Sequence, residues 1–272
     1  MLNRLITFIK NKICKCNNEE VLVNTDTVTD IEQVCDEQDL LYCTDYKLTE
    51  NITIHIPTLK EILAYGEDNY FKIISMILST SKDYMVQLDD IGKDYEEITD
   101  FELFSQMLFL SLKEMNSSLV FSNLNLADFE LCQNKVNNEI VLYSEKDNLI
   151  IDRYIYAIIC DKLREILYVE KDRYKAGNKE AKAFIIERTR KKQIKASKKP
   201  YKPILRPMII SLVNCQEFKY NYNEVLELNI FQFYSSVKAI QKRINFDQIM
   251  SGIYTGAISS KDINMQEINW LG

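Results

Sequence analysis

Glycine and proline are scarce in this chain: its 272 residues include 6 glycines and 4 prolines. These two residue types form most tight turns, glycine because it tolerates positive φ and proline because its ring fixes φ. A chain with so few of them is poorly suited to the many reverse turns of a large β-barrel. Hydrophobic residues make up 46% of the chain, enough to fill a core. We therefore expect a mainly helical globular protein with one large domain or two modest ones.

Charge is distributed unevenly along the chain. Residues 1–150 contain 12 Lys/Arg and 27 Asp/Glu, whereas residues 151–272 contain 22 Lys/Arg and 13 Asp/Glu. An acidic first half and a basic second half are expected either to face each other or to contact different partners. Two solvated faces without such a role are an equal alternative.

The first fifty residues divide into two segments. Apolar residues recur on one helical stripe near the start, which predicts an amphipathic helix over residues 1–16. Residues 17–50 hold ten acids and one base, a composition typical of a mobile linker. We expect the helix to pack on the protein's own core or on a partner rather than on a membrane surface. No apolar run reaches the roughly 18 residues that span a bilayer, which predicts a soluble protein.

Residues 51–151 are expected to form an α+β domain. Alternating isoleucines over residues 52–56 predict a short strand. Capping boxes at residues 58–61 and 99–102 predict two helix starts, and residues 89–100 form an acidic loop between them. Three further short runs predict a small antiparallel meander: 129–133, 139–143 and 149–151.

Residues 152–272 are expected to form a helical domain with a basic helix and a tail that carries the only tryptophan, Trp270. Helices are predicted from residue 153 to about 169, around 179–197, over 204–213, over 230–243 and near 246–254. The stripe Phe233, Val237, Ile240 and Ile244 is regular enough to be core. The predicted fold is therefore α+β and mainly helical, with a small antiparallel β meander in the first half and a helical second half.

Candidate catalytic residues are few. His55 is the only histidine, and no G-x-S-x-G elbow accompanies it, so we expect a structural role for His55. Neither of the common glycine-rich phosphate-binding motifs occurs. We expect no catalytic residue and no cofactor.

Metal binding is not expected either. Cys14, Cys16, Cys35 and Cys43 lack the paired spacing of structural zinc sites. The acidic run over 89–100 lacks the glycine and terminal glutamate of a calcium loop. The odd number of cysteines, seven, favours reduced thiols in a cytosolic protein. The three remaining cysteines are predicted to be buried: Cys132, Cys160 and Cys215.

The strongest local feature is the basic segment at residues 170–206, with 14 Lys/Arg and four acids. Aligned cations contact the phosphates of nucleic acid. A solvated or internally paired helix explains the same run and is preferred, because aromatic residues are few there. We also expect residues 17–50 to attract this segment weakly. The candidate basic patch comprises Arg188, Arg190, Lys191, Lys192, Lys195, Lys198 and Lys199.

The end of the chain is the candidate partner-binding region. Residues 257–272 have little helical periodicity and still carry several large apolar side chains. Such side chains on a terminus either dock on the parent fold or are offered to a neighbour. The candidate contact residues are Met265, Ile268, Trp270 and Leu271.

Three groups of motifs carry a resemblance to a known family. The first comprises residues 57–62 (PTLKEI), 66–71 (GEDNYF), 88–95 (LDDIGKDY) and 101–104 (FELF). The second comprises residues 213–215 (VNC) and 218–222 (FKYNY). The third comprises residues 236–242 (SVKAIQK), 250–256 (MSGIYTG) and 268–270 (INW). Together they resemble a family of tailed-bacteriophage virion-module proteins found in phages of low-GC Gram-positive hosts.

The resemblance spans roughly residues 51–272 and implies a tail-assembly or tail structural protein. Its implied partners are other phage structural or tail proteins, or copies of the chain itself. Its implied location is the host cytoplasm during assembly, with the virion as a second option. The family's motifs transfer no catalytic residue. The alternative is a nucleic-acid-binding phage protein that uses residues 170–206.

Overall fold

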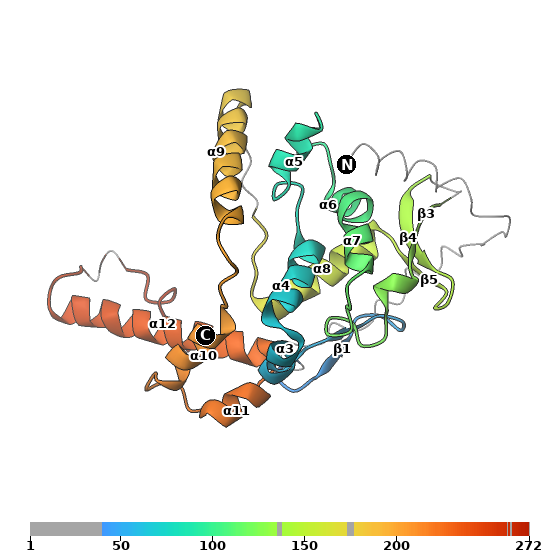
Figure 1. The fold of residues 1–272 in the computed structure, drawn as a ribbon. Helices are drawn as coiled ribbons and strands as arrows, with labels where there is room; N and C mark the ends of the chain where they lie inside the picture. Colours follow the sequence, from blue (N-terminus) through green and yellow to red (C-terminus); the bar gives the residue numbers. More distant parts are fainter. Residues whose placement is uncertain (1–39, 135–137, 173–176, 260, 262, 272) are drawn as a thin grey trace.

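The computed structural model describes residues 40–134, 138–172, 177–259, 261 and 263–271. Helices account for 53% of the described residues and strands for 9%, so the described part of the protein is α+β and mainly helical, as the sequence predicts. The predicted helix over residues 1–16 lies outside the described residues, and so does most of the predicted linker. Figure 1 shows the small sheets at one side of the molecule and the long helix α12 (Ile230–Tyr254) at the other.

The end of the predicted linker belongs to the fold. Leu40 is fully buried, and Tyr46 on strand β1 (Asp45–Lys47) is nearly so. β1 pairs antiparallel with β2 (Thr53–His55), and Tyr46 lies opposite Ile54. A linker over residues 17–50 is therefore wrong for residues 40–50. Composition misleads here because one aromatic and one aliphatic side chain are enough to anchor an otherwise acidic stretch.

Both predicted capping boxes are present. The Thr58 hydroxyl accepts a hydrogen bond from the third amide of α3 (Leu59–Tyr65), and Thr99 does the same for α6 (Asp100–Leu103). α6 continues through a π-helical turn (Phe104–Leu108) into α7 (Phe109–Lys113). α4 (Glu67–Leu78) begins directly after Gly66, and α5 (Met85–Asp90) follows it.

The predicted meander is confirmed. β4 (Ile140–Ser144) lies between β3 (Glu130–Gln133) and β5 (Leu149–Ile151), and both pairings are antiparallel. A short 3-10 turn (Leu126–Asp128) precedes β3.

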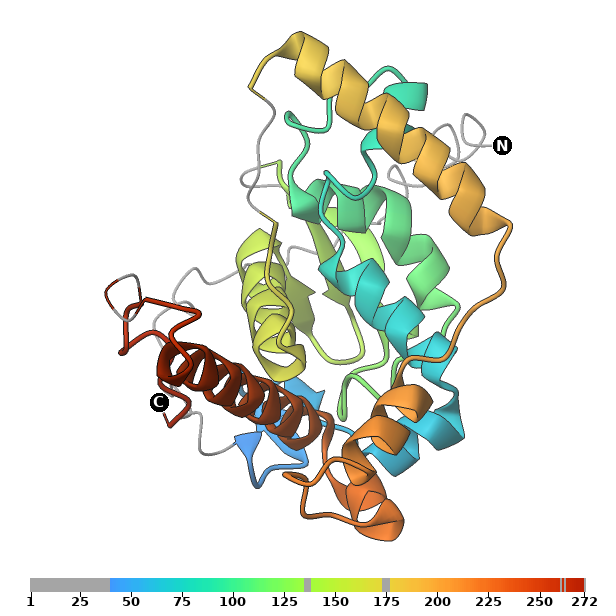
Figure 2. The same cartoon turned by 90° about the vertical axis from the view of Figure 1, so that its left-hand side faces the viewer.

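Helix α8 (Arg153–Leu167) is the central helix, and it contacts α4, α6, β5 and α12 (Figure 2). The Tyr156 hydroxyl donates to the Ile77 carbonyl at 2.7 Å, and the Arg164 guanidinium donates to the Leu78 carbonyl at 3.2 Å. These two carbonyls lie at the C-terminal end of α4, where no amide of the same helix donates to them. Side chains of α8 thus supply the hydrogen bonds that the last carbonyls of α4 lack.

Of the three thiols predicted to be buried, only Cys160 on α8 is buried; Cys132 and Cys215 are half-buried. Burial raises the pKa of the Cys160 thiol to about 11. Cys160 therefore behaves as a small apolar group at neutral pH.

A buried carboxylate holds α10 (Leu205–Val213) on α4. Glu67 accepts hydrogen bonds from the Tyr201 hydroxyl at 3.0 Å, the Leu205 amide at 2.9 Å and the Ile204 amide. The first amides of a helix have no acceptor within it and favour an anion. Glu67 therefore fixes the start of α10 against the first half of the chain.

A second junction lies where α11 (Tyr222–Glu227) passes into α12. The Leu59 amide donates to the Leu228 carbonyl at 3.0 Å, and the Ile230 amide donates to the Pro57 carbonyl at 2.9 Å. Asn229 caps α12 by accepting a hydrogen bond from the Gln232 amide at 2.8 Å.

α12 is one continuous helix where the sequence predicts two. Phe233 is fully buried, Val237 and Ile240 are half-buried, and Ile244 is 39% exposed. The predicted core stripe therefore holds only at its beginning. Beyond residue 240 the helix extends away from the body, and the following residues fold back along it (Figures 1 and 2).

Removal of the Glu67 carboxylate is expected to be among the most destabilising single changes. Glu67→Ala leaves two backbone amides and one phenol without an acceptor, at a cost of about 3 kcal/mol or more of unfolding free energy. Urea unfolding measures the change. Asp68→Ala is the matched control: Asp68 is exposed in the same helical turn, and its loss should cost less than about 1 kcal/mol. Equal effects of the two variants would contradict the assignment.

Candidate functional site

The basic segment forms α9 (Lys179–Ser197), with the bounds that the sequence predicts. Asn178 caps it by accepting a hydrogen bond from the Ala181 amide at 2.7 Å. Alanine, glutamate, lysine and arginine dominate its sequence, and these residue types favour helix. None of its residues is buried, and it lies along the outside of the molecule (Figure 2).

One face of α9 is attached to α5 and the loop after it. Lys182 forms ion pairs with Asp94 and with Glu96, the latter at 2.9 Å, and its ammonium lies 4.5 Å from the centre of the Tyr95 ring. Two turns further on, the Arg190 guanidinium makes a second set of contacts. It binds the carboxylates of Asp89 at 2.8 Å and Asp90 at 2.5 Å.

Four acids of the run at residues 89–100 are therefore paired with the basic helix while their carboxylates remain partly exposed. The sequence expectation that residues 17–50 attract α9 concerns mostly residues outside the described part of the chain. A cavity of about 420 Å³ remains between α9 and the acidic loop. Its lining includes the paired charges, so these ion pairs stay hydrated and weak.

The electrostatics agree with this pairing. A hydrogen bond from Lys182 lowers the pKa of Asp94 below its usual value. Burial lowers the pKa of Lys182, but hydrogen bonds to Asp94 and Glu96 outweigh burial and raise it overall. Both partners therefore stay charged at neutral pH.

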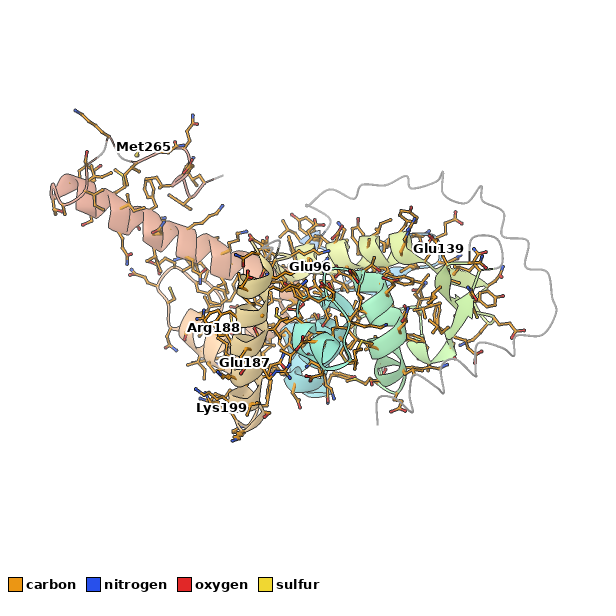
Figure 3. The ribbon with its side chains drawn as sticks, turned by 90° about the horizontal axis from the view of Figure 1, so that it is seen from above. Glu96, Glu139, Glu187, Arg188, Lys199 and Met265 are labelled. Carbon is orange, nitrogen blue, oxygen red and sulfur yellow. The ribbon has the colours of Figure 1, made fainter. Side chains whose placement is uncertain are left out.

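The predicted basic patch is divided between the two faces of α9 and the two residues that follow its end. Arg190 faces the acidic loop, and Lys191 lies 3.4 Å from Glu187 on the same helix. The other patch residues are exposed and form no ion pair with any described residue: Arg188, Lys192, Lys195, Lys198 and Lys199. Arg188 and Lys199 are labelled in Figure 3. Lys182 was missed, although its four-residue spacing to Ile186 and Arg190 places all three on one helix face.

We define residues 241–271 as the C-terminal arm. Among its described residues none is buried. The Trp270 ring lies against Arg243 on α12, with 4.5 Å from the guanidinium carbon to the ring centre. The tail thus docks on α12 of its own chain and not on the core.

The four predicted contact residues differ in exposure. Ile268 and Trp270 are half-buried, whereas Met265 is 48% and Leu271 75% exposed. Figure 3 places Met265 far from the body of the molecule. Whether they bind a partner remains a prediction.

His55 lies between two carboxylates. Its Nδ1 is 3.1 Å from Asp45 Oδ1, and its Nε2 is 3.7 Å from Glu61 Oε2. The Ser122 hydroxyl donates to Asp45 and not to the imidazole. In a catalytic triad the nucleophile is hydrogen-bonded to the imidazole. Here the nearby hydroxyl is bonded to Asp45 instead, so the geometry supports a structural role for His55.

The histidine contacts affect both acids. Burial raises the pKa of Asp45, but hydrogen bonds from Ser122 and His55 outweigh burial and hold the pKa below its usual value. Burial also raises the pKa of Glu61, yet hydrogen bonds from Thr58 and the charge of His55 lower it overall.

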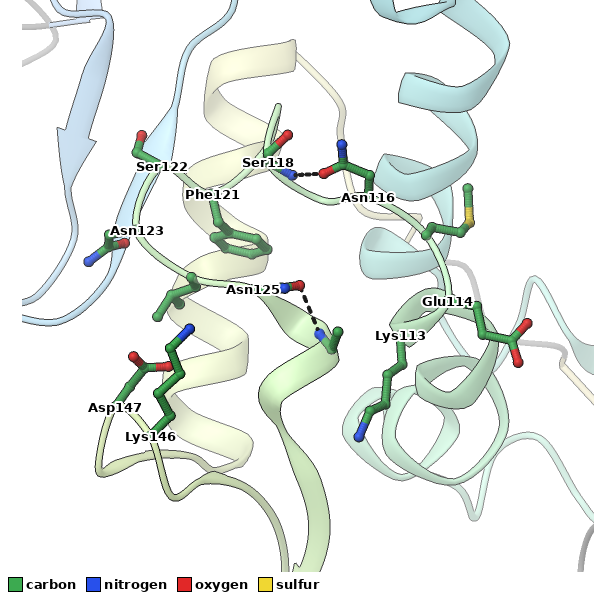
Figure 4. A pocket seen from close by; sticks show the side chains of 13 residues that line it. Lys113, Glu114, Asn116, Ser118, Phe121, Ser122, Asn123, Asn125, Lys146 and Asp147 are labelled. Atoms are coloured by element: carbon green, nitrogen blue, oxygen red, sulfur yellow. Dashed lines mark hydrogen bonds between the residues drawn. The ribbon is translucent and has the colours of Figure 1, made fainter.

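A polar pocket of about 530 Å³ lies among the loops that follow α7 (Figure 4). Its polar groups mostly stabilise those loops: Asn116 accepts from the Ser118 amide at 3.0 Å, and Asn125 accepts from the Ala127 amide at 3.1 Å. Lys146 donates to Asp128 at 2.8 Å. The pocket therefore offers little for orienting a small ligand.

Two searches of the described residues complete the survey of sites. No group of three or more His, Cys, Asp or Glu side chains there is placed to hold a metal ion. No helix in that part of the chain combines the length and the apolar character that crossing a membrane requires.

Residues 197–272 match the family described as YomV second domain, a phage-derived family of the Bacillus-prophage type. The match begins at the last residue of α9 and covers α10, α11, α12 and the tail. It fits a phage protein, as the resemblance in the sequence implies, without specifying the tail. No curated protein and no solved structure matches the chain.

Loss of both cationic anchors should loosen α9 without unfolding the protein. In a Lys182→Met, Arg190→Met variant, amide hydrogen exchange over residues 179–197 should accelerate, because those exposed ion pairs hold the helix in place. The unfolding free energy should fall by less than about 1 kcal/mol per pair. Lys195→Met, on the opposite face, is the control. Unchanged exchange in the double variant would show that the ion pairs do not hold α9.

Replacement of His55 should raise two carboxyl pKa values. In the wild type the lowered pKa values of Asp45 and Glu61 favour the folded state above their ordinary pKa values, and this contribution disappears as pH falls through the lowered ones. His55→Gln should move both pKa values upward in an NMR titration, so acid unfolding begins at higher pH. The pKa of Asp94, which Lys182 lowers, should not move. Unchanged values at Asp45 and Glu61 would refute the role given to His55.

Proposed function

We propose that the chain is a non-catalytic phage protein that acts in the tail or in its assembly through protein contacts of its C-terminal arm. The observation that carries this proposal is that the arm extends from the body with no buried residue among those described. Segments that contribute nothing to a core and still expose large apolar side chains commonly serve as interaction sites.

The exposed apolar side chains of the arm support protein contacts. Tyr254 is 81% exposed, and Ile244, Met265 and Leu271 also face solvent. Aromatic and methionine side chains are enriched at protein interfaces. The segment that matches the phage-derived family includes the whole arm, so the arm belongs to the part of the chain with a phage relationship.

A non-catalytic role is supported by the surroundings of His55. Each ring nitrogen of His55 lies next to a carboxylate, that of Asp45 or Glu61, and the nearby Ser122 hydroxyl donates to Asp45. The partners we propose are other phage structural or tail proteins, or copies of the chain itself. The place we propose is the host cytoplasm during assembly, with the virion as a second location that mass spectrometry of purified particles tests.

Truncation of the tail tests the proposal directly. Deletion of residues 264–272 removes no buried residue among those described, so the protein should unfold at nearly the wild-type denaturant concentration. Tagged protein that lacks these residues should no longer capture phage structural proteins from infected cells. Loss of folding would show that the tail is part of the core. Capture equal to wild type would show that these residues are not part of the interface.

A milder variant separates contact from stability. Met265→Ser with Leu271→Ser changes two exposed side chains and leaves Trp270 on Arg243. This variant should weaken partner capture at least tenfold and leave helical circular dichroism unchanged. Lys219→Ser, an exposed change outside the arm, is the control.

A further inference from the structure

The outward face of α9 and the two residues directly after its end carry five cations that no described acid neutralises: Arg188, Lys192 and Lys195 on the helix, and Lys198 and Lys199 beyond it. The cations on the inward face, Lys182 and Arg190, are paired with four carboxylates. The whole chain has 40 Asp/Glu against 34 Lys/Arg, so acids for neutralisation are abundant. The unpaired face is a feature of this helix and not of the composition.

This arrangement disfavours the isolated helix. Arg188, Lys192 and Lys195 follow one another at spacings of four and three residues, where side chains are neighbours on a helix surface and like charges repel. Burial offsets little of this repulsion, because α9 has no fully buried residue and its apolar contacts with the core are made by half-buried Ile185 and Ile186. A counter-charge from outside the chain would remove it.

We propose that the outward face of α9 binds the phosphate backbone of nucleic acid. The cations extend from residue 188 of α9 to residue 199, two residues beyond its end, which is roughly 16 Å at the helical rise of about 1.5 Å per residue. A duplex presents one phosphate charge per about 1.7 Å of its axis, so about nine phosphates lie within that length. Five cations can therefore each reach a phosphate.

The acids behind α9 do not cancel this surface. An α-helix with its side chains is about 10–12 Å across, whereas charges are screened over about 8 Å at physiological ionic strength. The inner side of α9 faces four carboxylates, those of Asp89, Asp90, Asp94 and Glu96. Their ion pairs with Lys182 and Arg190 neutralise part of their negative charge. Among the described residues, the outer face thus remains locally positive on a chain of net charge −6.

The side chains of this face are suited to contact the phosphate backbone of nucleic acid and not to recognise individual bases. Lysine is a flexible point charge without the planar fork that orients arginine on a guanine edge. Phe184, 67% exposed one turn before Arg188, adds a ring on which an unpaired base can stack. Binding is therefore expected to be insensitive to sequence and to extend to single strands.

The test measures binding of the full chain to a fluorescent mixed-sequence DNA duplex over a series of salt concentrations. Five phosphate contacts predict a slope of log affinity against log salt of about −4.5, at about 0.9 per contact. In the triple variant Lys192→Gln, Lys195→Gln, Lys199→Gln the slope should weaken to about −1.8, and the affinity at low salt should fall at least tenfold. Phe184→Ala should weaken single-strand binding more than duplex binding.

The matched control is Lys47→Gln, Lys72→Gln, Lys219→Gln, which removes three exposed charges outside both α9 and the C-terminal arm and should keep the wild-type slope. Should the triple variant lose helicity, Lys195→Gln alone, with an expected slope change of about 0.9, decides the question. No binding of wild type at low salt, or equal loss in the control, overturns the proposal. Binding to vesicles of anionic lipid without binding to DNA also overturns it.

Discussion

The arrangement of the second half of the chain depends on one buried carboxylate. Burial of an ionised carboxylate is costly unless hydrogen bonds replace its water, and Glu67 has three such donors around residues 201–205. Burial and the neighbouring Glu67 charge raise the pKa of both Tyr201 and Tyr234 to about 12, so these phenols stay neutral and Tyr201 can donate. Because the segment that matches the phage-derived family begins at residue 197, this contact attaches that segment to the rest of the chain.

The fixed points determine where surfaces are left for partners. α8 is packed in the core, and residue 201 is bound to Glu67, so α9 spans the distance between two anchored ends. α9 has no fully buried residue: its half-buried Ile185 and Ile186 pack against the core, and the ion pairs of Lys182 and Arg190 attach one of its faces. The C-terminal arm begins where the packing of α12 against the core ends, after Ile240. Both candidate surfaces therefore lie where the chain makes its weakest tertiary contacts, as is common for binding elements.

The sequence predicts local structure well, because caps and periodicity act over a few residues. The box from Thr58 to Glu61, the box from Thr99 to Glu102 and the bounds of α9 are all found in the structure. The misses involve distant partners. β1 forms because Tyr46 reaches the core, and the acids around Asp94 pair with a lysine 88 residues away. Neither contact leaves a pattern within its own segment, so the division of the basic patch into a paired and a free face could not be derived from spacing alone.

The apolar stripe of α12 explains why the helix is continuous although its pattern looks interrupted. Phe233, Val237 and Ile240 lie on one side, and at about 100° per residue a second set lies nearly opposite. That set, half-buried, is Phe246, Ile249, Met250 and Ile253. The first side faces the core, and the folded-back tail covers part of the rest: Ile258 packs against Gly252, where an added Cβ would lie 2.5 Å from it, and Trp270 rests on Arg243. The tail therefore packs on α12 and not on the core. The contacts of the arm are thus made within the arm itself, beyond the part of α12 that packs on the body.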